Sequence, residues 1–180
     1  MSVSEERSDG MMGGAAGRLA IYPGTFDPVH HGHVDIARRA ARLFDQVVVA
    51  VYDRPSKSLL FSPEERISLF RASLDAVGAH DVVVEGYSGL TVNYAHRRGA
   101  IAIVRGLRAV FDFEYEYQMT TMNRHLQAGV ETVFLTTSLE FAYLSSTIVK
   151  EVAFGGAELD GLVPSVVADA LTSRLVSHPR

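Results

Sequence analysis

Two histidines three positions apart, His30 and His33, stand near the start of the chain within residues 24–33, GTFDPVHHGH. This stretch follows an apolar run at residues 19–22 and precedes a helical pattern, which places it between a strand and a helix. In α/β proteins, such a loop offers the backbone N–H groups of a helix start to a phosphate chain. Gly32 lacks the Cβ that would keep a phosphate away from the backbone. The stretch therefore predicts a site for a nucleotide triphosphate.

The two imidazoles have alternative interpretations. A single histidine near a helix start is usually a surface residue, and two histidines at this spacing could also bind zinc. Asp27 is the only nearby carboxylate, and Pro28 leaves its direction uncertain. We therefore favour imidazole donors that act, together with the helix start, on charge developing at a phosphoryl oxygen. No side chain is predicted to bind a metal.

Cations follow two further apolar runs. Lys57 comes after residues 46–52, and Arg105 and Arg108 flank a glycine shortly after another run. Two guanidinium groups can hold separate phosphates by paired hydrogen bonds. The alternatives are a solvated lysine and arginines that pair with the acidic residues Glu114 and Glu116.

Ser145, Ser146 and Thr147 precede an apolar helical run, where hydroxyl side chains are typical N-caps. Lys150 lies in the first turn of that helix and opposes its dipole, so we expect a bound phosphate there. Together the four loops supply anion ligands without a plausible covalent nucleophile. Reactions that need only positioning and charge neutralisation are in-line phosphoryl and nucleotidyl transfers.

The elements that must position these loops alternate between β-branched runs and helical patterns. This alternation predicts an α/β fold with a doubly wound, five-stranded parallel sheet, in a single domain over residues 18–180. The expected strands are 19–22, 46–52, 81–85, 101–104 and 132–135. The expected helices are 34–44, one starting at Ser62, 91–98, 113–126, 147–154 and 164–176. Ligands of such sheets bind beyond the carboxyl ends of the strands, where the four loops would meet.

Composition limits the choice of partners. The chain has 180 residues, 47% of them hydrophobic, with a formal net charge of -4 and no cysteine. An acidic balance argues against nucleic acid and anionic membranes as partners, and no apolar stretch reaches the ~20 residues of a membrane-spanning helix. The lack of cysteine excludes disulfides. Residues 1–17 are rich in Ser, Gly and acidic side chains, so we expect a disordered extension.

Five strings in this chain are similar, in order and spacing, to the bacterial phosphopantetheine adenylyltransferase family: YPGTFDPVHHGH, PSK, RGLRAVFDFEYE, MNRHL and SSTIVKEVA. The stretch HHGH also resembles the (T/H)xGH motif of the wider nucleotidyltransferase superfamily, and residues 145–150 resemble its ISSTxxR/K motif. The resemblance implies a Rossmann-like nucleotidyltransferase fold and transfer of AMP from ATP to 4′-phosphopantetheine. The products are dephospho-coenzyme A and pyrophosphate, in the biosynthesis of coenzyme A. It further implies Mg²⁺ bound through the ATP phosphates and a cytoplasmic homohexamer.

The resemblance also implies roles for individual residues. The catalytic residues would be His33, Lys57, Arg108 and Thr25. The phosphopantetheine site would consist of Thr25, Lys57, Thr91 and Arg105. The ATP site would consist of Thr25, Phe26, His30, His33, Gly106, Leu107, Arg108, Glu116, Phe141, Ala142, Tyr143, Leu144, Ser145, Ser146 and Thr147. Two positions depart from the family pattern, because Leu144 replaces an isoleucine and Phe141 stands where tryptophan is common.

Two other functions stay open at this point. A sister nucleotidyltransferase with another phosphate acceptor, such as nicotinamide mononucleotide, would share the histidine loop. A non-catalytic sensor would bind ATP without turnover. Feedback inhibition by coenzyme A is expected if the acceptor is phosphopantetheine, because both molecules carry the same pantetheine arm.

Overall fold

The computed structural model describes residues 17–55, 58–108 and 110–177. Within them, five parallel strands form one sheet in the order β3-β2-β1-β4-β5. The strands are β1 Leu19–Gly24, β2 Gln46–Tyr52, β3 Val83–Tyr87, β4 Ala102–Leu107 and β5 Glu131–Thr136. From β1 the chain adds β2 and β3 on one side of the sheet, and then β4 and β5 on the other side. The loops that follow β1 and β4 therefore lead in opposite directions and leave a crevice for ligands at the carboxyl ends of these strands.

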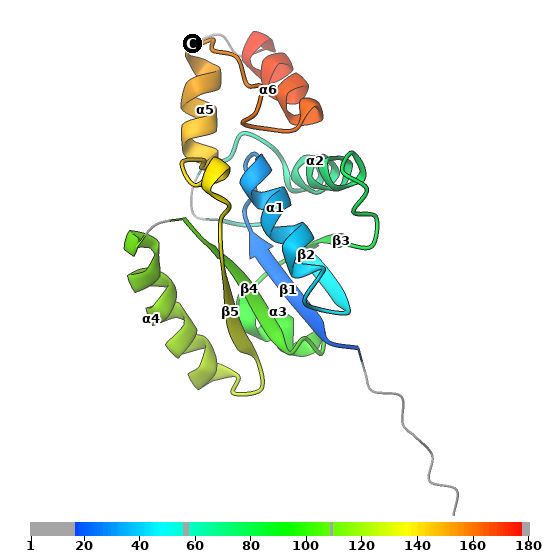
Figure 1. Cartoon of the computed structure of the whole chain (residues 1–180), viewed down its shortest axis with the longest axis vertical. Helices are drawn as coiled ribbons and strands as arrows, with labels where there is room; N and C mark the ends of the chain where they lie inside the picture. Colours follow the sequence, from blue (N-terminus) through cyan, green and yellow to red (C-terminus); the bar gives the residue numbers. More distant parts are fainter. Residues whose placement is uncertain (1–16, 56–57, 109, 178–180) are drawn as a thin grey trace, which may run out of the picture.

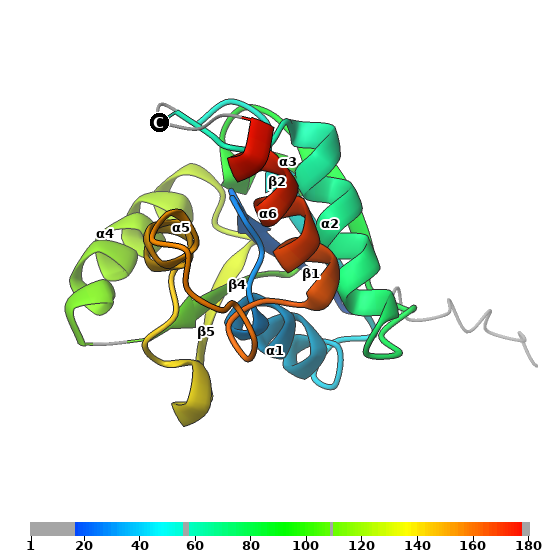
Figure 2. The same ribbon diagram turned by 90° about the horizontal axis from the view of Figure 1, so that it is seen from above.

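Helices cover both faces of the sheet and its carboxyl end. On one face lie α1 (His31–Ala40) and α2 (Pro63–Asp75), and on the other lie α3 (Thr91–Arg97) and α4 (Val110–Leu126). The short helix η1 (Leu139–Phe141) follows β5. Figure 1 shows α5 (Ser146–Phe154) and α6 (Ser165–Ser177) beyond the carboxyl ends of the strands, and Figure 2 shows α6 beside α2.

The β1 strand shows why the sheet is doubly wound. Ala20 and Tyr22 belong to the apolar core under α1 and α2, whereas Leu19 and Ile21 belong to the core on the α3 side. All four side chains are buried. Because neighbouring side chains of a strand point to opposite faces, an uninterrupted apolar run requires cover on both sides. The predicted fold class is therefore confirmed.

The elements mostly occur where the sequence predicts them, with shifted ends. Strand β2 has the predicted bounds, whereas β3 lies two residues later because residues 79 and 82 close a turn. Strand β4 continues past residue 104, so that Arg105 and Gly106 lie in the strand and not after it. Helix α1 begins three residues earlier than predicted, because His30 is its N-cap. Helices α4 and α5 also begin earlier, by three residues and one residue.

Helix α6 packs against the segment that joins β2 to α2. The Arg174 guanidinium forms an ion pair with Glu65 and lies 5.1 Å from the centre of the Phe61 ring. Glu65 also completes the predicted capping box with Ser62, whose backbone N–H donates to its carboxylate. The last helix therefore braces a loop of the site described below.

In the described residues, no helix is both long and apolar enough to cross a membrane. The prediction of a disordered extension falls almost entirely on residues 1–16, which lie outside the described part of the chain.

Candidate active site

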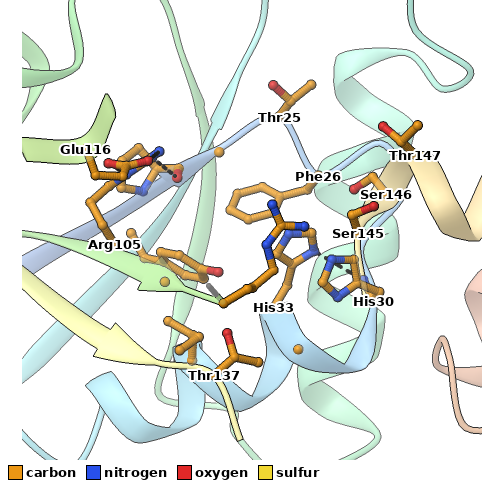
Figure 3. A pocket seen from close by; sticks show the side chains of 17 residues that line it. Thr25, Phe26, His30, His33, Arg105, Glu116, Thr137, Ser145, Ser146 and Thr147 are labelled. Atoms are coloured by element: carbon orange, nitrogen blue, oxygen red, sulfur yellow. Dashed lines mark hydrogen bonds and ion pairs between the residues drawn. The ribbon is translucent and has the colours of Figure 1, made fainter. Parts of the chain in front are cut away.

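A cavity of about 350 Å³ opens at the carboxyl ends of β1 and β4 (Figure 3). Segments far apart in sequence line it: the end of β1 with its loop and the start of α1, the end of β4, one residue each from α4 and from just after β5, and the start of α5. We call it the first cavity. Its lining residues are Tyr22, Pro23, Gly24, Thr25, Phe26, His30, Gly32, His33, Ile36, Arg105, Gly106, Arg108, Glu116, Thr137, Ser145, Ser146 and Thr147.

His30 and His33 lie together in this cavity, and their rings stack with centres 3.6 Å apart. The backbone N–H of His30 donates to Nδ1 of His33 over 3.2 Å. Because a backbone N–H can only donate, Nδ1 of His33 is the unprotonated nitrogen, and a neutral ring carries its proton on Nε2. The loop therefore fixes His33 as a neutral N–H donor.

Burial keeps both rings uncharged near neutral pH. Desolvation, helped by the neighbouring His30 and Arg108, holds the pKa of His33 well below 6.5. Desolvation likewise lowers the pKa of His30 to about 3, with Arg108 and His31 acting in the same direction. The buried Nδ1 of His30 has no hydrogen-bond partner among the described residues. A ligand that bonded to this nitrogen would satisfy it.

The loop between β1 and α1 is held in an unusual backbone conformation. Phe26 has a φ of +52°, a region that side chains other than glycine rarely adopt. Its ring contacts His33 edge to face, with centres 4.9 Å apart. A Cβ on Gly24 would come within 2.5 Å of the Phe26 ring, so glycine is required beside it. Strain of this kind concentrates at functional sites.

Lys150 lies near the start of α5, as the sequence predicts, but its partner is a side chain of the protein. Its Nζ lies 2.9 Å from Oδ2 of Asp27, a carboxylate that is only 1% exposed. The cation near the start of α5 is therefore explained by a buried carboxylate, and the phosphate predicted at this point is not needed to explain it. The sequence could not show this contact, because the two residues are 123 positions apart.

Arg105 is also paired within the protein. Its Nε and Nη2 donate to the two carboxylate oxygens of Glu116 over 2.8 and 2.5 Å, and its Nη1 donates to the Pro23 carbonyl over 3.2 Å. Burial opposes its charge, but Glu116 outweighs this effect and the pKa of Arg105 is raised. The alternative in which an arginine pairs with a following glutamate therefore holds for Arg105. Arg108 donates to the Leu144 carbonyl over 3.1 Å and lines the first cavity.

A second cavity of about 430 Å³ lies on the other side of Gly24 and Thr25. It shares with the first cavity only the residues Pro23, Gly24, Thr25, Arg105 and Glu116. The rest of its lining is largely aromatic and apolar: Tyr52, Tyr87, Gly89, Leu90, Thr91, Ile103, Tyr115, Met119, Thr120, Asn123 and Thr132. The Thr91 hydroxyl lies 2.8 Å from the Tyr87 hydroxyl, within hydrogen-bond distance. Two ligands could therefore meet end to end at Thr25.

Comparison with known proteins gives a consistent result. Residues 21–152 match the family model for cytidylyltransferase-like proteins. The phosphopantetheine adenylyltransferase of Moorella thermoacetica is 51% identical over 87% of this chain and 97% of its own. That of Desulfosudis oleivorans is 45% identical over 91% of this chain and 98% of its own. That of Thioalkalivibrio sulfidiphilus is 49% identical over 87% of this chain and 98% of its own.

The chain belongs to the phosphopantetheine adenylyltransferase family. A solved structure supports the fold: the bifunctional NMN adenylyltransferase/ADP ribose pyrophosphatase from Francisella tularensis superposes with a TM-score of 0.66. The two sequences are 14% identical, and the superposition covers 89% of this chain and 50% of the other. The predicted Rossmann-like nucleotidyltransferase fold is confirmed.

The structure gathers most of the residues that the family resemblance assigns to ATP. Ten of these line the first cavity: Thr25, Phe26, His30, His33, Gly106, Arg108, Glu116, Ser145, Ser146 and Thr147. The other five do not line it: Leu107, Phe141, Ala142, Tyr143 and Leu144. Leu144 is fully buried, so its side chain cannot reach a ligand. Phe141 instead stacks on His31, with ring centres 5.8 Å apart.

The residues assigned to phosphopantetheine lie around the second cavity where the structure describes them. Thr25, Thr91 and Arg105 line it. The fourth, Lys57, falls outside the described residues, and its assignment stays a prediction of the family resemblance.

Reasoning from motifs missed several lining residues. Tyr22, Ile36 and Thr137 line the first cavity, and Tyr52 and Tyr87 line the second. The tyrosines come from the β1, β2 and β3 strands. Their place near the ends of predicted parallel strands was the available signal, because ligands of such sheets bind there.

Proposed function

We propose that this chain transfers AMP from ATP to 4′-phosphopantetheine, giving dephospho-coenzyme A and pyrophosphate. The observation that carries the proposal is the wall shared by the two cavities, formed around Gly24 and Thr25. Two substrates bound on either side of this wall would meet with their reacting groups adjacent. Such preorganisation supplies much of the acceleration of a two-substrate reaction.

The chemistry of the linings assigns a substrate to each cavity. The first cavity has the starts of α1 and α5, two imidazoles and Arg108, all suited to a triphosphate. The second offers Tyr52, Leu90 and Met119, which suit the slender and partly apolar pantetheine arm.

The reaction we propose is a single in-line displacement. A phosphate oxygen of the acceptor forms a bond with the α-phosphorus of ATP. The bond from that phosphorus to the oxygen bridging the α- and β-phosphates breaks, and pyrophosphate leaves with the electron pair. No adenylyl-enzyme forms, and the attacking phosphate is already ionised at neutral pH, so no general base is required.

His33 would stabilise the crowded α-phosphate of the transition state. Its Nδ1 is held by the His30 backbone, which leaves the Nε2 proton for an oxygen of the ligand. Arg108 would neutralise the triphosphate, and the Thr25 hydroxyl would lie near the attacking phosphate. Lys57 would hold the acceptor phosphate.

Mg²⁺ would enter with ATP and be bound through its phosphates. Within the described residues, no three His, Asp or Glu side chains gather to hold a metal ion. Glu116, the one carboxylate lining the first cavity, is paired with Arg105. The ion would partly neutralise the triphosphate, and the residues named above would position the triphosphate.

We further propose, from the family resemblance, a cytoplasmic homohexamer and competition by coenzyme A for the second cavity.

The test is acceptor-dependent release of pyrophosphate. The purified protein, ATP and Mg²⁺ are incubated with 4′-phosphopantetheine, with pantetheine, or with nicotinamide mononucleotide. We expect pyrophosphate with phosphopantetheine alone, because pantetheine lacks the attacking phosphate. Release with nicotinamide mononucleotide alone would assign the chain to a different acceptor. ATP binding without release in any mixture would indicate a sensor.

A further inference from the structure

A buried carboxylate lies directly behind the site without lining either cavity. Asp27 is 1% exposed and belongs to the loop between β1 and α1. It is absent from the linings of both cavities, so it does not offer its oxygens to a substrate bound there. An ionised carboxylate that is removed from water must be compensated by donors or cations. Its partners therefore indicate its role.

Asp27 has partners on two other segments of the chain. Its Oδ1 accepts the backbone N–H of Phe61 over 2.9 Å, and its Oδ2 accepts that of Leu60 over 3.0 Å. Lys150, the fifth residue of α5, places its Nζ 2.9 Å from Oδ2. One carboxylate thus joins the first loop, the segment before α2, and helix α5.

Two of the three joined segments line the first cavity. The loop that contains Asp27 carries Thr25 and Phe26 at one end and His30 at the other. The start of α5, one turn from Lys150, carries Ser145 to Thr147, which lie on the same side of the cavity as His30 in Figure 3. The segment that ends at residues 60 and 61 is the one in which the family resemblance places the acceptor-phosphate lysine.

A neighbouring contact acts between two of the same segments. The Ser146 hydroxyl donates to the Pro28 carbonyl over 2.8 Å. This bond brings the start of α5 close to the first loop, while the buried side chains of Val149 and Ala153 hold the helix in the core. The ion pair one turn further along is a second polar contact between the loop and the helix, and together with this packing it sets the direction in which the start of the helix faces.

We infer that the Asp27–Lys150 ion pair positions the start of α5 against the histidine loop, so that both grip the same triphosphate during adenylyl transfer. Lys150 is a positioning residue in this arrangement and not a ligand of ATP. ATP can still bind in the ground state when the start of α5 is slightly displaced. Stabilisation of the transition state is lost by the same displacement, because it requires the groups of the cavity at defined positions. Loss of the pair should therefore lower kcat more than it raises the KM for ATP. The inference rests on the proposed adenylyl transfer.

The experiment compares Lys150→Met and Lys150→Arg with the wild type in the pyrophosphate assay. Methionine keeps an unbranched apolar stem without charge, and arginine restores a cation. We expect Lys150→Met to lower kcat by about 10- to 100-fold with a change in the KM for ATP of less than about threefold. Lys150→Arg should recover most of kcat.

A matched control separates this effect from the general loss of an ion pair. Arg18 and Asp45 form an exposed pair beside the start of β1, and neither they nor their chain neighbours line a cavity. Arg18→Met should leave both kinetic constants unchanged. Thermal unfolding of every variant is measured, and the assays are run well below the lowest midpoint.

Should Lys150→Met fail to fold, the double variant Asp27→Asn/Lys150→Met removes both buried charges and is tested in its place, with the same loss of kcat expected. A folded variant with the kcat of the wild type would overturn the inference and leave the pair a stabilising contact only. A rise in the KM for ATP at unchanged kcat would also overturn it, since Lys150 would then be an ATP ligand. A wild-type protein without acceptor-dependent turnover would instead refute the proposed function. The two failures are therefore distinguishable.

Discussion

Arg105 and Glu116 form a two-point ion pair on the wall between the two cavities, with donor–acceptor distances of 2.8 and 2.5 Å. Both residues line both cavities. A third bond ties Arg105 to the carbonyl of Pro23, next to the glycine at the end of β1. The pair therefore holds α4, β4 and β1 in a fixed relation at the point where the two substrates would meet.

Arg105→Lys should weaken the acceptor site. A lysine ammonium cannot contact both oxygens of Glu116 and the Pro23 carbonyl in the planar geometry that a guanidinium provides. We expect the KM for phosphopantetheine to rise about tenfold, equivalent to about 1.4 kcal/mol, with little change in the KM for ATP. Steady-state kinetics with each substrate varied in turn would measure this. Arg18→Lys is the control, because Arg18 also contacts both oxygens of a carboxylate, that of Asp45, but lines neither cavity. An unchanged KM for the acceptor in Arg105→Lys would contradict the role we give to Arg105.

His33→Ala should remove transition-state stabilisation. The variant lacks the Nε2 donor but keeps the helix starts and Arg108, so ATP should still bind. We expect kcat to fall by about 10²- to 10³-fold, as for loss of one oxyanion donor, with ATP affinity measured by titration calorimetry. His80→Ala, which changes an exposed histidine, should have no effect. Full turnover by the His33 variant would show that another group stabilises the α-phosphate.

The stability of the protein should fall in mild acid because of His30. Its pKa is about 3 in the folded state, against an ordinary value of 6.5. Between these two values the unfolded chain binds more protons than the folded one, so stability is lost as pH falls below about 6.5. From pH 7 to pH 5 the expected loss is about 2 kcal/mol for this one residue.

Denaturant unfolding at the two pH values would test this prediction, with His30→Thr as the comparison. Threonine supplies a hydroxyl that is typical of an N-cap and matches the superfamily motif, but it cannot take up a proton in this range. The variant should lose about 2 kcal/mol less than the wild type over the same interval. Equal losses would mean that His30 is protonated normally in the folded protein.

Gly24→Ala should distort the loop that carries Phe26. The added Cβ would lie 2.5 Å from the Phe26 ring, which packs against His33 and Phe70. Overpacking of this kind costs about 1–3 kcal/mol, and displacement of the ring should also lower kcat. Gly129→Ala is a matched control, because a Cβ there meets nothing within 4 Å. Chemical denaturation and the pyrophosphate assay would test both variants.

Lys57→Ala should impair use of the acceptor more than binding of ATP. The prediction follows from the family resemblance, which assigns the acceptor phosphate to this lysine. Loss of a charge-assisted contact to a phosphate is expected to cost about 1.5–3 kcal/mol. Arg54→Ala changes an exposed cation of the same segment and should be neutral. A loss confined to ATP affinity would contradict the assignment.

The sequence predicted elements well where one local signal decides them. The β2 strand is rich in valine and has the predicted bounds, and the capping box at Ser62 occurs as expected. The start of α1 was misplaced because its cap depends on a contact between the His30 backbone and the His33 ring. A histidine is not a typical cap, so nothing in the local sequence indicated the extra turn.

Long-range pairing accounts for the contacts at the site that the sequence did not determine. Arg105 and Lys150 were both interpreted as phosphate ligands, because each is a cation at the end of a strand or the start of a helix. Their partners, Glu116 and Asp27, lie 11 and 123 positions away. The sequence allowed the Arg105–Glu116 pair as an alternative, because acidic residues follow Arg105 closely. It did not indicate the Asp27–Lys150 pair, because the direction of the Asp27 side chain depends on the folded loop.

The distance along the chain between Asp27 and Lys150 has a consequence for synthesis. A nascent chain that has left the ribosome only as far as β5 already contains Asp27, His33 and Arg105, but Asp27 still lacks its cation. Helix α6, whose Arg174 braces Phe61, emerges later still. The proposed contacts to the triphosphate can therefore be complete only after α5 has been synthesised, and products truncated before α5 that retain the histidine loop should be unable to consume ATP.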